Sequence, residues 1–226
     1  MNKDEYKKLI EEKPWQWAED HFDKLENYQP IEICTLNINE NDWLDFSINN
    51  FDLAEQNYES ASGHQTDFAR KLAETNVLLG RNQYNSFEVN YGVKSNLNYQ
   101  MIEMLGIDNL NKLNFIPEYT LVRLLIKFPG QGVAWHTDTC QQYQKKFPDL
   151  KIDQNTFQSN KGKIVRYWFS VTDWCRGHMF QISNTILWNY KKGQVFQIPF
   201  GHGHASSNAG LQPQFSVALT GIIKKS

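Results

Sequence analysis

The sequence predicts a mainly β protein, an antiparallel sandwich or barrel preceded by helices. Aromatic residues make up 14% of the 226 residues, which is typical of a sheet whose inward face is packed with large rings. From residue 119 onward, short runs rich in β-branched and aromatic residues follow one another between Gly, Pro, Asn and Asp. Because no helical pattern separates most of these runs, their strands are expected to pair antiparallel.

Helices are predicted in the N-terminal part. Segment 2–12, NKDEYKKLIEE, has acidic residues at its start and apolar residues at helical spacing, and Pro14 ends or kinks it. Segment 15–28 continues the same period, and segments 65–80 and 96–107 look like helices that a glycine closes. We expect this part to form a helical flank beside the sheet.

Six strand segments are predicted in the C-terminal part. They are YTLVRLLIKF at 119–128, VAWHTDT at 133–139, KIVRYWFSV at 163–171, HMFQISNTILW at 178–188, QVFQIPF at 194–200 and QFSVALTGII at 214–223. The connection from Thr139 to Lys163 is too long for a hairpin turn, so its composition allows either a lid or binding loop or a disordered insert.

Composition excludes some classes of protein and disfavours others. The net charge is −2 without a long run of either sign, which disfavours nucleic-acid binding without excluding it. No apolar run approaches the roughly 18 residues that span a membrane. Three widely spaced cysteines, odd in number, are typical of free thiols in a reducing cytoplasm. A protein of the cytoplasm is therefore expected.

The stretch GQGVAWHTDTC carries the most specific chemistry. On a strand, His136 and Asp138 would project from the same face and could hold one ion together. A third ligand would come from His178, His202 or His204. Two histidines and a carboxylate leave three positions open, which suits non-haem Fe(II), although Zn(II) in a hydrolase accepts the same set. A His-x-Asp pair also occurs by chance, with the aspartate capping a turn.

Three segments together resemble a known family. LVRLLIKFPGQGVAWHTDT, RYWFSVTDWCRGHMFQISNTILWNYKKGQVFQIPFGHGHASSNAG and PQFSVALTGI are similar to the Fe(II)/2-oxoglutarate-dependent oxygenases, most of all to the small oxygenases of marine tailed bacteriophages. The resemblance covers about residues 115–223. It implies a double-stranded β-helix, or jelly roll, over 116–226, with 1–115 as helical flank and first strands of a single domain spanning 1–226.

The same resemblance implies the metal ligands. Fe(II) would lie at the mouth of the jelly roll, held by His136, Asp138 and a distal histidine. The family places that histidine before a few small residues and then Asn-x-Gly, and HASSNAG puts this pattern on His204. His202 is then expected to lie in the pocket and contact substrate, and His178 to lie nearer the rim without binding metal.

The cosubstrate 2-oxoglutarate needs a base for its distal carboxylate. Family members commonly carry this base about ten residues after the distal histidine, with Ser or Thr two residues later. Here those positions hold Gln214 and Ser216, so the expected base is replaced by a neutral amide. Either another strand supplies the base, or the cosubstrate is not 2-oxoglutarate. Arg166, inside an otherwise apolar strand, is the first replacement and Arg123 the second, unless each lies on a solvated strand face.

The resemblance implies an enzyme that hydroxylates a C–H bond. A peptide or protein residue, with proline the first candidate, is the leading substrate, and Trp135 and Trp174 would form its aromatic rim unless they are packing residues. A nucleobase or small-metabolite oxygenase is the alternative enzyme. A non-catalytic jelly-roll binding module is the alternative of another class; Gln214 favours it, and an intact ligand set argues against it.

Overall fold

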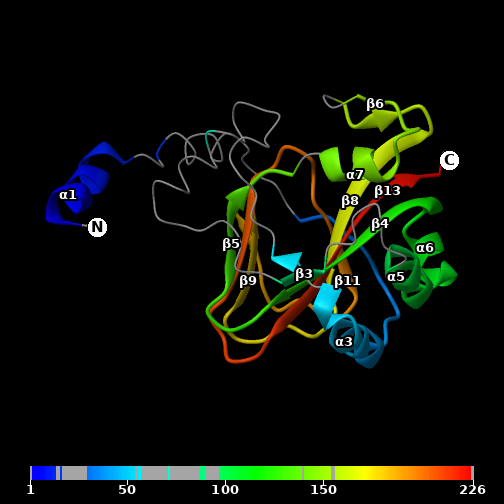
Figure 1. Cartoon of the computed structure of the whole chain (residues 1–226), viewed down its shortest axis with the longest axis horizontal. Coiled ribbons are helices and arrows are strands. Elements are labelled where there is room, and N and C mark those ends of the chain that lie inside the picture. The colour runs from blue at the N-terminus through cyan, green and yellow to red at the C-terminus, as the bar shows by residue number, and fades with distance from the viewer. Residues whose placement is uncertain are drawn as a thin grey trace.

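Seven strands form one sheet of the computed structural model, two short strands extend that sheet, and four strands form a second (Figure 1). The structure describes residues 2–13, 16, 30–53, 55–56, 71, 87–89, 97–138, 140–153 and 156–224. The helices predicted over 15–28 and 65–80 lie almost entirely outside these residues.

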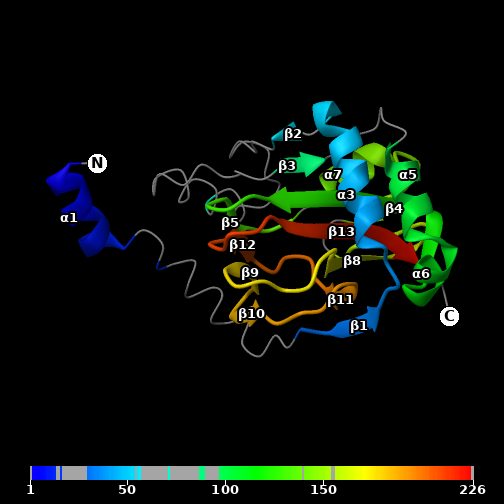
Figure 2. The same ribbon diagram turned by 90° about the horizontal axis from the view of Figure 1, so that it is seen from below.

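The large sheet has the order β1-β11-β8-β13-β4-β3-β2, and the small sheet has the order β10-β9-β12-β5 (Figure 2). The strands of the large sheet are β1 (Glu32–Thr35), β2 (Glu55–Gln56), β3 (Phe87–Val89), β4 (Phe115–Lys127), β8 (Gly162–Ser170), β11 (Gln194–Gln197) and β13 (Gln214–Ile223). Those of the small sheet are β5 (Gly132–His136), β9 (His178–Ile182), β10 (Thr185–Leu187) and β12 (His204–Asn208). From β4 onward the chain passes back and forth between the two sheets, and all their pairings are antiparallel. This is the double-stranded β-helix, and it confirms the predicted fold class.

Alternation along the strands gives the large sheet two different faces. Val122, Leu124 and Ile126 of β4 belong to the main core cluster, together with Val217 and Leu219 of β13. Helices α3 (Glu40–Asn49), α5 (Leu97–Leu105) and α6 (Ile107–Lys112) supply the other side of that cluster and cover this face (Figure 1). The odd-numbered residues of β4 and the even-numbered residues of β13 therefore face the small sheet.

A second cluster fills the space between the sheets. Trp168 of β8 stacks on Phe180 of β9, with ring centroids 4.6 Å apart, and Tyr190 meets the Trp168 ring edge-on at 5.2 Å. Phe196 and Ile182 belong to the same cluster. These rings hold the two sheets together and place the end of β12 beside the centre of β8.

The helical predictions hold wherever the residues are described. Helix α1 (Lys3–Glu12) begins at an Asn2 cap that accepts from the Glu5 backbone N–H at 2.9 Å. Gly106, with φ of 77°, ends α5 by donating to the Ile102 carbonyl at 3.0 Å. Helix α3 and the one-turn helix η1 (Phe51–Leu53) lie in the N-terminal part that was expected to flank the sheet, in a stretch of mixed pattern where no individual helix was predicted. Trp43 of α3 is buried edge-on against Phe169, and this tertiary contact stabilises the helix.

The described part of the connection between residues 139 and 163 is folded, so the disordered insert that composition also allowed is wrong, and a role as a lid or binding loop stays a prediction. It contains α7 (Gln141–Lys146) and the pair β6 (Ile152–Asp153) and β7 (Gln158–Ser159). Tyr143 and Leu150 are buried in a third cluster with Leu121 and Ile164, and the Tyr143 hydroxyl donates to the Tyr119 carbonyl at 2.6 Å. Only a few of its side chains pack in this cluster, so most of the connection can be polar.

The three cysteines are free thiols. Within the described ranges, no helix is long and apolar enough to cross a membrane.

Asn98 fixes α5 to the large sheet, and its removal should destabilise the fold. Its side chain donates to the Thr120 carbonyl at 3.0 Å and accepts from the Val122 N–H at 2.8 Å. Asn98→Ala leaves both buried backbone groups unpaired, so we expect about 2–4 kcal/mol less free energy of unfolding, measured by urea denaturation. Asn41→Ala, at an exposed position of α3, is the control. If Asn98→Ala lowers the free energy of unfolding no more than the control does, the two hydrogen bonds of Asn98 contribute nothing to stability.

Candidate metal centre

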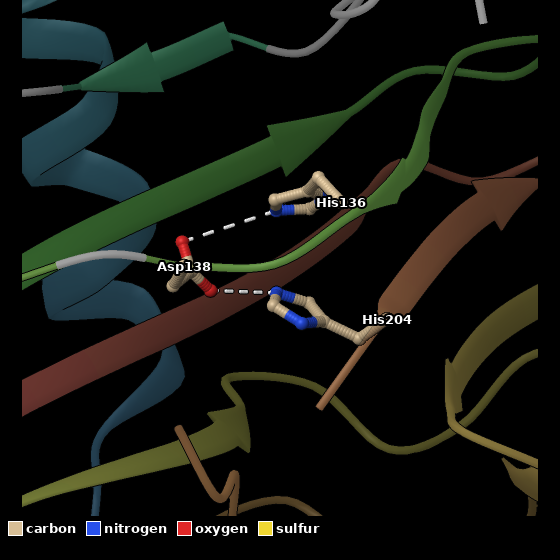
Figure 3. A group of neighbouring side chains, drawn as sticks. All are labelled: His136, Asp138 and His204. Carbon is tan, nitrogen blue, oxygen red and sulfur yellow. Dashed lines mark ion pairs between the residues drawn. The ribbon is translucent and has the colours of Figure 1, made fainter. Parts of the chain in front are cut away.

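Three potential ligands meet at one end of the small sheet (Figure 3). His136 is the last residue of β5, His204 is the first residue of β12, and the two are direct partners in the antiparallel register. The Nε2 atom of His136 lies 3.9 Å from one carboxylate oxygen of Asp138, and the Nε2 atom of His204 lies 2.7 Å from the other. One ligand atom from each residue lies within 4.8 Å of the others. The predicted set therefore converges.

Asp138 reaches the site differently from the prediction. Strand β5 ends at His136, so Asp138 lies on the irregular segment that follows and not on the same strand face. The carboxylate still presents one oxygen to each imidazole (Figure 3). Because Asp138 lies beyond the end of β5, strand alternation does not account for its place beside the two histidines.

Backbone carbonyls fix which nitrogen of each ring faces the site. His136 Nδ1 lies 2.9 Å from the Ala134 carbonyl, and His204 Nδ1 lies 3.2 Å from the His202 carbonyl. A carbonyl oxygen can only accept, so both Nδ1 atoms carry the proton. Each Nε2 lone pair is then directed at Asp138 and is free to bind a metal, the arrangement common to metal-binding histidines.

Burial keeps both imidazoles neutral. The pKa of His204 is lowered to about 3, first by burial and then by the charge of Arg166. Burial also holds the pKa of His136 well below its ordinary value, and the neighbouring His204 lowers it further. Neutral imidazoles are the form that binds metal, so near neutral pH this pair needs no deprotonation.

Arg166 lies beside the three potential ligands. Its side chain is 7% exposed and its guanidinium contacts the Asp138 carboxylate. The solvated strand face that composition also allowed is therefore wrong for Arg166. Its predicted role as the 2-oxoglutarate base stays a prediction, and the contact with Asp138 gives it a second possible role, which is to hold the carboxylate in place.

Gln214 and Ser216 lie deeper, on the inward face of β13. Both are buried, and the Gln214 amide donates to the Tyr190 hydroxyl at 2.9 Å. The Gln214 side-chain oxygen and the Ser216 hydroxyl are buried without a hydrogen-bond partner among the described residues. Orphaned polar atoms are uncommon in protein interiors and often mark a place where a ligand or water binds.

Sequence reasoning missed Lys127. It is the last residue of β4, is 2% exposed, and is the direct cross-strand partner of Gln214. The signal was available, since a charged residue in an apolar strand is the criterion that selected Arg166 and Arg123. Lys127 escaped notice because it stands at the strand end, beside the Phe-Pro-Gly turn, where lysines are usually solvated. Arg123 itself is half-buried on β4.

Two further histidines of the described chain, His178 and His202, lie outside the ligand set. His178 is buried on β9 and its Nε2 atom lies 3.0 Å from the Gln212 carbonyl. His202 precedes β12, and its backbone carbonyl is the group that accepts from His204. Its predicted contact with substrate stays a prediction.

The two tryptophans of the predicted rim differ in their surroundings. Trp174 packs against the cluster between the sheets, and its indole N–H donates to the His178 carbonyl at 2.8 Å. Those contacts give Trp174 a role in packing. Trp135 is half-buried on β5, next to His136. A role in binding substrate stays a prediction for both.

Comparisons with known proteins give remote structural likenesses. No family model matches the chain, and no curated protein matches it. Similar solved structures include a predicted oxalate decarboxylase from Thermotoga maritima, at 14% identity and a TM-score of 0.29, covering 46% of this chain and 66% of that one. A Cupin 2 conserved barrel domain protein from Salinispora arenicola has 12% identity and a TM-score of 0.28 over 45% of this chain and 61% of its own.

A third likeness is to a sugar phosphate isomerase of a cupin superfamily from Silicibacter pomeroyi. It has 10% identity and a TM-score of 0.30, covering 45% of this chain and 50% of its own. The chain thus spans between half and two thirds of the length of these three proteins. Likenesses of this strength assign no activity.

The three ligands should bind a divalent metal together. We expect His204→Ala and Asp138→Ala each to weaken Mn(II) binding by at least roughly 100-fold, more than the loss of an outer-shell group costs, in anaerobic calorimetric titrations. His202→Ala is the matched control, because the carbonyl that orients His204 belongs to its backbone. Equal Mn(II) affinity in the control and in His204→Ala would exclude this centre.

Proposed function

We propose that the protein is an Fe(II)- and 2-oxoglutarate-dependent dioxygenase that hydroxylates a C–H bond of its substrate. The observation that carries the proposal is the convergence of His136, Asp138 and His204 on the end of a double-stranded β-helix. Two neutral imidazoles and one carboxylate are the donor set of the non-haem Fe(II) oxygenases. The similarity of residues 115–223 to that family supports the same assignment.

The donor set fits the metal by its own geometry. Both Nδ1 atoms are occupied by backbone carbonyls, so the two Nε2 atoms and one oxygen of Asp138 are the atoms that would hold Fe(II). When bound, the iron would supply the O₂ chemistry that converts 2-oxoglutarate, O₂ and a C–H bond into succinate, CO₂ and C–OH. A set of two histidines and one carboxylate would leave coordination positions of the metal open for other ligands.

The chain's own residues position the ligands and exclude water. The backbone of β5 and β12 orients the imidazoles, and Arg166 contacts the carboxylate that completes the set. Trp168, Phe180 and Tyr190 close the space between the sheets below them. A dry cavity with fixed ligands is the contribution that the protein makes when a cofactor carries the difficult step.

A residue in a peptide or protein is the substrate class we propose, with proline the first candidate. Trp135 stands half-buried beside the ligand His136, where an aromatic surface can meet an extended chain. The net charge of −2 gives no general attraction for nucleic acid. Free thiols agree with work in a reducing cytoplasm.

Turnover of 2-oxoglutarate tests the reaction directly. We expect the Fe(II)-loaded protein to form succinate from 2-oxoglutarate in air, with faster turnover when a substrate peptide is added, measured by chromatography and mass spectrometry. The peptide should gain one oxygen atom. Asp138→Ala should reduce succinate formation by at least roughly 1,000-fold, since the metal carries the chemistry.

The control is Lys163→Met, at an exposed position of β8, which leaves the three ligands intact. Absence of succinate with the wild-type protein, under conditions in which Fe(II) binds, would overturn the cosubstrate assignment. Succinate without oxygen gain in a proline-containing peptide library would leave the reaction standing and exclude peptidyl proline as the substrate. A screen with single-stranded oligonucleotides then separates the nucleobase alternative.

A further inference from the structure

The two imidazoles of the candidate metal centre are oriented by carbonyls in different settings. The Ala134 carbonyl, which accepts from His136, lies within strand β5, where the hydrogen bonds of the sheet hold it. The His202 carbonyl, which accepts from His204, lies in the loop of residues 198–203 that joins β11 to β12. The direction of the His204 ring therefore depends on the conformation of a loop.

Backbone hydrogen bonds fix the two ends of this loop. The Ile198 N–H donates to the Arg166 carbonyl at 2.9 Å. At the other end, the Gly203 carbonyl accepts from the Ser183 N–H at 2.8 Å. Between them, Gly201 has φ of 80°, and a Cβ at this position would meet nothing within 4 Å. Packing at Gly201 does not restrain the middle of the loop, so a side-chain contact has to do so.

Phe200 makes such a contact. Its ring stacks on the ring of Phe157, with centroids 4.2 Å apart and planes inclined by 11°, and stacking of this kind adds to the energy of burial. Phe157 lies in the turn between β6 and β7, in the connection of residues 139–163. Both rings are partly buried against the third cluster, whose members come from the large sheet and from the connection. The stack therefore ties the loop before β12 to the large sheet.

The backbone of Phe157 adopts an uncommon conformation. Its φ is 52°, in the left-handed region that bulky residues rarely enter. Its N–H donates to the Asp153 carbonyl at 2.8 Å, and its carbonyl accepts from the Ile164 N–H at 3.0 Å. Such conformations persist where the surrounding structure imposes them, and they are concentrated at functional sites. Here the imposed conformation presents the Phe157 ring to Phe200.

The same connection begins beside another potential ligand. Asp138 lies two residues before Cys140, which is fully buried in the third cluster. The Cys140 carbonyl accepts from the Gln144 N–H at 2.7 Å, where α7 begins. One folded segment thus restrains the chain next to Asp138 at its start, and the chain next to His204 through Phe157.

We propose that the Phe157–Phe200 stack is a positioning element of the metal centre. It holds the loop before β12, and through the His202 carbonyl it fixes the direction in which the His204 ring presents Nε2. The inference rests on the metal centre of the proposed function and deepens that function, because it gives the connection of residues 139–163 a part in metal affinity. It does not depend on the cosubstrate.

Metal affinity and ligand geometry test the inference without turnover. Mn(II) is titrated into the protein anaerobically by calorimetry, and the visible absorption of the Co(II)-loaded protein reports the geometry of its ligands. We expect Phe157→Ala to weaken Mn(II) binding by roughly 10-fold, within the range for groups that orient a metal ligand, and to change the Co(II) spectrum. Phe157→Tyr keeps the ring, so it should keep the wild-type affinity and spectrum.

Phe147→Ala is the matched control. Phe147 lies in the same connection and is partly buried against the same cluster, and its ring meets Tyr119 and Tyr143 edge-on at 5.7 and 4.9 Å. We expect Phe147→Ala to lower the melting temperature as Phe157→Ala does, and to leave the Mn(II) affinity and the Co(II) spectrum at the wild-type values.

A double-mutant cycle tests whether the two rings act together. Phe200→Ala should weaken Mn(II) binding as Phe157→Ala does. The double variant should bind Mn(II) no more weakly than either single variant, because the stack is one interaction and its loss is not additive. Additive losses would show that the two rings act independently and would overturn the role of the stack.

The remaining failures are distinguishable. Wild-type Mn(II) affinity in Phe157→Ala, or an equal loss of affinity in Phe147→Ala, overturns the positioning role and leaves the proposed function standing. If the expected loss occurs in Phe157→Ala but the Fe(II)-loaded wild-type protein forms no succinate, the inference stands and the proposed reaction is overturned. If the wild-type protein binds no Mn(II), both are overturned.

Discussion

The centre depends on the antiparallel pairing of β5 with β12, which sets His136 directly opposite His204. Each ring is oriented by a carbonyl two residues before it, that of Ala134 in β5 and that of His202 just before β12. Register is strict in a sheet with one buried face, because a slip of one residue would turn every side chain to the other face. Here a slip would separate the two histidines.

Burial of like charges is the second constraint on this interior. Arg166, Arg123 and Lys127 all act electrostatically on His204, and Asp138 is the carboxylate that Arg166 contacts. Burying positive charge is costly unless negative groups compensate it. Asp138 is the compensating group that the structure shows for Arg166.

Most of the fold and the ligand set could be predicted from the sequence. Strand boundaries followed from β-branched and aromatic runs between turn residues, the His-x-Asp pair indicated His136 and Asp138, and the family resemblance implied His204. Helix α3 was missed because its helical state depends on the burial of Trp43 against a distant strand. The folding of residues 139–163 was missed for the same kind of reason, since Tyr143 and Leu150 gain their partners only in the tertiary structure.

The contacts that could not be predicted from the sequence are those made between strands that are distant in the sequence. Nothing near Lys127 in the sequence indicates that Gln214 is its neighbour, because that contact exists only through the register of β4 with β13. Arg166 was correctly expected to lie inside the barrel, but its contact with Asp138 could not be foreseen. Side-chain alternation predicts which face a residue takes, and it does not predict how far along that face a ligand will lie.

A crystal structure of the protein grown anaerobically with Mn(II) would test the central claim most directly. Anomalous scattering locates the metal without assumptions about the chemistry. The account predicts one strong peak within coordination distance of His136 Nε2, His204 Nε2 and an oxygen of Asp138. A metal bound elsewhere, with the Asp138 carboxylate still paired to Arg166 and no peak among the three ligands, would contradict it.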